Sequence, residues 1–274
     1  DDSESRGLGD VYKRQLFIGT SKIQFSQEIV FVGSFGIILL LLIKLSNELD
    51  TKAKRMLLGT AIIIFVFRAM PGVGQGGSWF EIDVLKFDQE FLSLLGLIAS
   101  FLTIFGIFIL RPLMEKSSMS RLIIILSVAG SIFILPSIAM YYGFHEYTSK
   151  LTGGIVDERF IAIFNTALES PLGQVSMIPI LAWIAQSAPS HLKATFFAIL
   201  ASFTNLALSA SNLGTKYLNQ IFVITREVKT EQGEIKIPAD YSELGILLII
   251  VCLLTLIVPI IITFIIKKLR LISY

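Results

Sequence analysis

The chain has 274 residues, of which 54% are hydrophobic and only 16% are charged, and its formal net charge is +2 at pH 7. This apolar excess excludes a soluble globular domain and predicts an integral membrane protein. One cysteine excludes an internal disulfide, and two histidines far apart in sequence make no credible metal site, so we expect no metal and no cofactor.

The first fifteen residues, DDSESRGLGDVYKRQ, are polar and match neither a signal peptide nor a transit peptide. They resemble a translated sequencing adapter. Residues 1–15 are therefore expected to be a non-native leader, which makes the chain a fragment whose native N-terminus is missing.

Seven apolar segments follow that are long enough to cross a membrane, because a helix needs about 20 residues to cover roughly 30 Å of hydrocarbon. The expected spans are 28–44, 56–80, 89–110, 121–142, 158–187, 192–218 and 243–266. The sequence thus predicts an all-α polytopic membrane protein with seven transmembrane helices.

Basic residues gather in alternate connections between these spans. The connections at 44–55, 111–121, 187–193 and 267–274 hold eleven lysines and arginines, against six in the opposite set. Because lysine and arginine are enriched in cytoplasmic loops, the first set and the C-terminus are expected in the cytoplasm.

The second span contains the stretch RAMPGVGQGGSW, which would be unusual in a regular helix. If the chain left the membrane at Pro71, this span would have only about fifteen residues, which is short. We therefore expect a kinked or broken helix at Pro71, Gly72 and Gly76, facing protein or a watery cavity. Pro171 and Pro179 predict the same for the fifth span.

Two ionisable residues are expected near mid-bilayer, namely Arg68 in the second span and Glu169 in the fifth. A charge at that depth costs about 2.5 to 3.5 kcal/mol on insertion scales, so both are candidate functional residues. A mutual structural ion pair, or an arginine that reaches outward to the interface, is the alternative.

Uncharged polar residues share helix faces with these charges or form stripes of their own, since residues three, four or seven apart lie on one face. The candidates are Gln75, Asn165, Asn205 and Asn212, the last two in a stripe that continues to Lys216. They indicate a polar interior, although a buried amide can also bond a neighbouring helix. Ser211 and Thr215 fit close helix packing, and so does the third-span stripe with Ser100 and Thr103.

Several functional classes lack their motifs. The glycine-rich stretch has no Gly-Lys-Ser/Thr and follows no strand, so it is not a phosphate-binding loop. The chain contains no GxSxG elbow, no HExxH and no Ser-His-Asp set, so we do not expect an enzyme. No basic surface with interleaved aromatics points to nucleic acid.

The stretches FRAMPGVGQGGSWF, LKFDQEFLSLLG, RPLMEKSSMSR and DERFIAIFNTALESPLGQVSMIPILAWIAQSAPSHLKATFFAILASFTNLALSASNLGTKYL resemble the folate-biopterin transporter family of the major facilitator superfamily. The resemblance covers about residues 28–266 and implies helix six plus the C-terminal half of a twelve-helix fold. It divides the chain into the last helix of a missing N-terminal half (16–45), a cytoplasmic linker (46–55), a six-helix bundle (56–268) and a cytoplasmic tail (269–274).

The resemblance implies a proton-coupled secondary carrier of folate, biopterin or a related pteridine that works by alternating access in a bacterial inner membrane. Arg68 would hold a substrate carboxylate through its planar fork of donors. Glu169 would bond the aminopyrimidine or carry the coupling proton, and Gln75, Asn165, Asn205 and Asn212 would bond the pterin edge.

The implied partners are the solute, a proton, the lipid bilayer and the missing N-terminal half. Two alternatives remain. One is a carrier of the same fold for another anionic or amphipathic solute. The other, suggested by the span count alone, is a seven-helix receptor or channel subunit.

Overall fold

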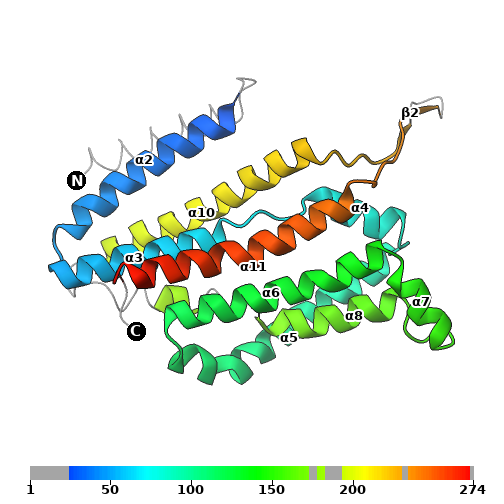
Figure 1. The fold of residues 1–274 in the computed structure, drawn as a ribbon, viewed down its shortest axis with the longest axis horizontal. Coiled ribbons are helices and arrows are strands. Elements are labelled where there is room, and N and C mark those ends of the chain that lie inside the picture. The colour runs from blue at the N-terminus through cyan, green and yellow to red at the C-terminus, as the bar shows by residue number, and fades with distance from the viewer. Residues whose placement is uncertain (1–24, 173–177, 183–192, 230–233, 272–274) are drawn as a thin grey trace.

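The computed structural model describes residues 25–172, 178–182, 193–229 and 234–271, and the expected leader at 1–15 lies outside them. The described chain is a bundle of long helices (Figure 1). Five helices are long and apolar enough to cross a membrane: α2 (Ser26–Ser46), α5 (Gln89–Lys116), α6 (Met119–Tyr141), α10 (Lys193–Ile221) and α11 (Leu244–Lys268). The predicted all-α polytopic membrane protein is confirmed.

The remaining two expected spans are interrupted helices. The second consists of α3 (Thr51–Arg68) and α4 (Gln75–Asp83), which are separated by a non-helical segment from 69 to 74. In the fifth, α8 (Glu158–Glu169) is followed by the 3₁₀ turn η1 (Ser170–Leu172), and residues 178–182 are again helical, whereas residues 173–177 and 183–187 lie outside the described residues. Proline fits both interruptions, because it has no amide hydrogen to donate within a helix.

Aspartates cap the N-termini of three helices, α3, α5 and α8. The side chains of Asp50, Asp88 and Asp157 accept hydrogen bonds from backbone amides three residues later, at 2.6, 2.8 and 2.8 Å. Each thus satisfies one of the amides that a helix leaves without an internal partner. The starts of α5 at 89 and α8 at 158 coincide with the predicted span starts.

The long helices pack in a definite order. Helix α11 lies along α6, where Ser131 donates to the Cys252 carbonyl at 3.3 Å and the Cys252 thiol donates back to the Ser131 carbonyl at 3.4 Å. Helix α10 packs against α2 and α3, whereas α8 packs against α5 and α6. The first interrupted span thus lies beside α10 and the second beside α5, and α6 contacts both.

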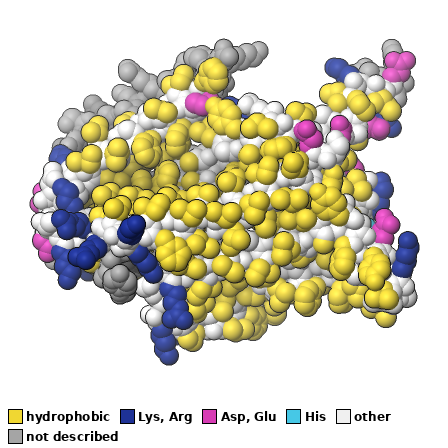
Figure 2. Space-filling model, in the orientation of Figure 1, with side chains coloured by type: hydrophobic (Ala, Val, Ile, Leu, Met, Phe, Trp, Pro, Cys, Tyr) yellow, Lys and Arg dark blue, Asp and Glu magenta, His cyan; other side chains and the backbone are white. Residues whose placement is uncertain are grey.

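Charge and apolar surface are distributed along the bundle axis. Figure 2 shows hydrophobic side chains over the middle and a gathering of Lys and Arg at the end that holds the α2–α3 and α5–α6 turns. The opposite end carries α7 (Phe144–Leu151) and an antiparallel hairpin of β1 (Val228–Lys229) and β2 (Ile235–Ile237). The α2–α3 and α5–α6 connections, which are expected on the same side of the membrane, thus lie at the same end.

Candidate functional site

The interruption of the second span begins immediately after a candidate residue. Arg68 is the last residue of α3 and is half-buried, and Gln75 is the first residue of α4 and is exposed. Between them Gly74 has a φ of 77°, a conformation that glycine adopts without strain. The segment from 69 to 74, called here the first break, therefore separates two helices rather than bending one.

One face of α10 binds the backbone of this first break. The Ser211 hydroxyl donates to the Met70 carbonyl at 2.6 Å, the Gly72 amide donates to Thr215 Oγ1 at 2.8 Å, and the Asn219 amide group donates to the Val73 carbonyl at 3.1 Å. These α10 residues are four apart and so share a helix face. Backbone groups left outside a helix at membrane depth need such partners, because lipid supplies none.

The second break, at η1, is bound by α5 in a related way. The Thr103 hydroxyl donates to the Ser170 carbonyl at 3.0 Å. Next to it Gly106 lies so close to Pro171 that a Cβ atom there would come within 2.8 Å of the proline carbonyl carbon. Helix α5 thus contacts the fifth span at the point where α8 ends.

The six candidate substrate-binding residues fall into two groups. Arg68 and Gln75 border the first break, and Asn205 and Asn212 are exposed on the neighbouring α10. Glu169 is the last residue of α8, where it is exposed, and Asn165 lies one turn earlier and is half-buried. Each group includes one charged residue at the end of a helix.

The predicted kink residues also have defined places. Pro71 and Gly72 lie inside the first break, and Gly76 is buried in α4, where a Cβ atom would come within 2.8 Å of Ile224. Pro171 is in η1. Pro179 is buried in the helical stretch at 178–182, beyond the second break.

A contact that the sequence did not reveal joins α2 to α10. Lys216 Nζ lies 2.7 Å from Glu28 Oε1, and the Tyr217 hydroxyl donates to the same oxygen at 2.8 Å. Helical periodicity groups Lys216 with Asn212. The signal that could have identified its partner is an opposite charge at a similar depth in another span.

A second cluster of polar side chains, outside the expected membrane span, holds the end of α4. Arg226 donates two hydrogen bonds to Asp83, both at 2.8 Å, and the Tyr241 hydroxyl donates a third at 2.7 Å. The hydrogen bond from Arg226 lowers the pKa of Asp83, and burial together with the bond to Asp83 raises the pKa of Tyr241 to about 12. Helix α4 is thus held at its start by α10 and at its end by the α10–α11 connection.

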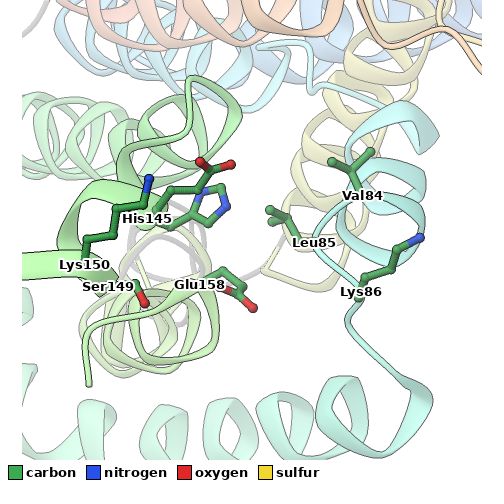
Figure 3. Close-up of a pocket in the computed structure, with 8 residues that line it drawn as sticks. Val84, Leu85, Lys86, His145, Ser149, Lys150 and Glu158 are labelled. Atoms are coloured by element: carbon green, nitrogen blue, oxygen red, sulfur yellow. The ribbon is translucent and has the colours of Figure 1, made fainter. Parts of the chain in front are cut away.

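A shallow cavity of about 370 Å³ opens at the same end of the bundle, beside α7. Figure 3 shows Val84, Leu85 and Lys86 on one side of it and His145, Ser149, Lys150 and Glu158 on the other. None of the candidate substrate-binding residues lines this cavity. Within the described residues no group of three or more His, Cys, Asp or Glu side chains is arranged to hold a metal.

Long apolar helices, together with two interrupted spans whose backbones are bound by neighbouring helices, define an all-α polytopic membrane protein. The family model of the BT1 family matches residues 22–274, and the chain therefore belongs to the BT1 family. This match confirms the resemblance found in the sequence.

A curated relative agrees with the family assignment. The chain is 23% identical over 156 residues to the folate-biopterin transporter of Synechocystis sp., and the match covers 57% of this chain and 30% of that relative. The aligned part thus spans less than a third of the relative's length. No solved structure matches the chain.

Proposed function

We propose that the protein to which this chain belongs is a secondary transporter that moves folate, biopterin or a related pteridine across a bacterial inner membrane. Its family and the named activity of its Synechocystis relative support this proposal. Transport would proceed by alternating access and would be coupled to protons.

The observation that carries the proposal is the first break, which lies between the half-buried Arg68 and the exposed Gln75 and whose backbone is bound by three α10 side chains. Secondary transporters use interrupted helices of this kind near mid-membrane, because freed backbone groups can bind solutes and the interruption permits bending. A helix that served only to anchor the chain in lipid would gain nothing from such a segment.

The candidate residues offer chemistry that suits a pteridine with attached carboxylates. The guanidinium of Arg68 can donate two parallel hydrogen bonds to one carboxylate. The amides of Gln75, Asn205 and Asn212 are exposed in this chain and can donate to and accept from the edge of a pterin ring. Asn165 and Glu169 offer an amide and a carboxylate at the second break, and Glu169 is our candidate for the proton carrier.

The same proposal places the remaining parts of the chain. Residues 16–45 would be the last helix of a preceding N-terminal half, and residues 46–55, which include the turn between α2 and α3, would be the linker. Residues 56–268 would form the C-terminal bundle, followed by a cytoplasmic tail at 269–274. The preceding half would cover the exposed side of α10 and complete the solute site.

Uptake of labelled folate into cells that express the full-length protein tests this function. Accumulation that an uncoupler abolishes, and that is lost in Arg68→Ala and Glu169→Gln variants, would support it. Ser202→Ala is the matched control, because this exposed α10 residue has no assigned role. If the wild-type protein reaches the membrane without accumulating folate, the solute is a different one, such as another small anion.

A further inference from the structure

The two breaks share a local arrangement that involves a proline. In the first, Ser211 donates to the carbonyl of Met70, the residue before Pro71. In the second, Thr103 donates to the carbonyl of Ser170, the residue before Pro171. In both cases a hydroxyl from a neighbouring helix binds the carbonyl that directly precedes the proline.

A glycine completes each arrangement at the same spacing. Gly214, three residues after Ser211, faces Pro71, since a Cβ atom there would lie 3.3 Å from the proline Cβ. Gly106, three residues after Thr103, faces Pro171 still more closely. Residues three apart share a helix face, so the hydroxyl and the glycine contact the same segment of the broken span.

This pairing has a physical reason. The hydroxyl supplies a donor to a carbonyl that lies outside regular helix, and the glycine lets the proline approach the neighbouring helix closely. We define a clip as the hydroxyl–glycine pair together with the segment that it contacts. In the first clip Ser211 and Gly214 on α10 contact the first break, and in the second Thr103 and Gly106 on α5 contact η1.

Both clips lie beside a candidate charged residue. Arg68 is two residues before Met70, and Glu169 is adjacent to Ser170. A shift of the bound carbonyl therefore moves the end of the helix that carries the charge. Because α10 and α5 are long and continuous, they provide fixed supports against which the two helix ends are held.

We propose that Ser211 and Thr103 are positioning residues that hold Arg68 and Glu169 in place, and that the two clips loosen when the broken spans bend during transport. The positioning role rests on the proposed function, whereas the clips themselves can be tested without any solute. Ser211→Ala and Thr103→Val remove one hydroxyl each, and Ser211→Thr and Thr103→Ser retain it.

The first test is amide hydrogen exchange of the full-length protein, followed by mass spectrometry. Ser211→Ala is expected to speed exchange in residues 69–75 about fivefold, the change expected from one lost hydrogen bond. Thr103→Val is expected to do the same in residues 170–172. The hydroxyl-retaining variants should exchange at the wild-type rate, as should the controls Ser202→Ala on α10 and Ser100→Ala on α5, whose hydroxyl bonds only its own helix. Unchanged exchange in both hydroxyl-deleted variants would overturn the proposal.

The second test measures folate uptake in the same variants. We expect the KM to rise severalfold when a hydroxyl is deleted and to return to the wild-type value in Ser211→Thr and Thr103→Ser. Faster exchange without any change in KM or maximal rate would remove the positioning role. If the wild-type protein takes up no folate, the proposed solute is wrong, and the exchange rates alone decide whether the clips exist.

Discussion

The ammonium group of Lys216 lies 2.7 Å from Oε1 of Glu28, and this contact fastens the first helix of the described chain to the sixth expected span. Glu28 is in the first turn of α2 and Lys216 is near the end of α10, so the pair lies toward the end of the bundle opposite the basic connections. Both side chains are partly shielded, with 18% of Glu28 and 36% of Lys216 exposed.

Substitutions at this pair should be non-additive. Glu28→Gln or Lys216→Met alone leaves one charge without its partner, so each should lower the thermal unfolding temperature. The double variant should lose less than the sum of the two single losses, because it removes both charges. Unfolding temperatures of all four proteins in detergent provide the measurement, and strictly additive losses would show that the contact is not formed.

Because Gly106 lies close to Pro171, alanine substitutions at Gly106 and at Gly96 of the same helix should have opposite effects on stability. Gly106→Ala should destabilise the protein by about 1–3 kcal/mol, because the added methyl group meets the Pro171 backbone. Gly96→Ala is the control on the same helix α5. A Cβ atom at Gly96 would have no neighbour within 4 Å, so this substitution should stabilise the protein by about 0.5–1 kcal/mol. Equal effects of the two substitutions in chemical unfolding would contradict the packing described for the second break.

At Arg68 we expect shape to matter as well as charge. Arg68→Lys keeps the positive charge but loses the planar fork, so the KM for folate should rise about tenfold, which corresponds to about 1.4 kcal/mol. Arg121→Lys at the exposed start of α6 is the matched control and should leave the KM unchanged. Full uptake by Arg68→Lys at low substrate concentration would exclude a paired hydrogen bond to the solute.

Protonation of Asp83 should release the end of α4. Its folded-state pKa lies below the ordinary value of 3.8, chiefly because Arg226 donates to it. Its contribution to stability is therefore complete above that ordinary value and is lost as the pH falls through the lower folded-state pKa.

Fluorescence-detected unfolding between about pH 5 and pH 2 should therefore show a steeper loss of stability in the wild type than in Asp83→Asn. Glu227→Gln is the control, since the exposed pair of Glu227 with Lys229 contributes little to stability. Identical pH dependence of the wild type and Asp83→Asn would rule out a role for this carboxylate.

The single cysteine provides a reporter of unfolding. Cys252 is buried between α11 and α6, so a thiol-reactive dye should not label it in the folded protein and should label one site per chain on heating. The labelling temperature should fall in Gly106→Ala and rise slightly in Gly96→Ala. Rapid labelling at room temperature would mean that α6 and α11 separate in the folded state.

Hydropathy alone predicted the starts of several helices closely. Helices α5 and α8 begin at the expected residues, and α11 begins one residue after the expected start at 243. These positions are predictable because every span must be apolar over the length that crosses the hydrocarbon core. The interruption at Pro71 was also predictable, since a fifteen-residue span would have been too short and proline ends a helix locally.

The partners of the broken segments were not predictable in the same way. Ser211 and Thr215 looked like small packing residues, and they do pack closely, but their hydroxyls also bind the backbone of the first break. One stripe of small polar residues fits both roles. Lys216 shares a helix face with Asn212, yet it contacts Glu28, which is 188 positions away. Helical periodicity gives the face on which a residue lies and not the helix that meets that face.

Since Ser211 and Thr103 bind main-chain carbonyls, the clips place no requirement on which side chains occupy positions 70 and 170. Evolutionary change could therefore alter these two positions freely while the supporting helices keep a hydroxyl followed three residues later by glycine. Among diverging members of the family, positions 70 and 170 should therefore vary more than the hydroxyl and glycine positions of α5 and α10.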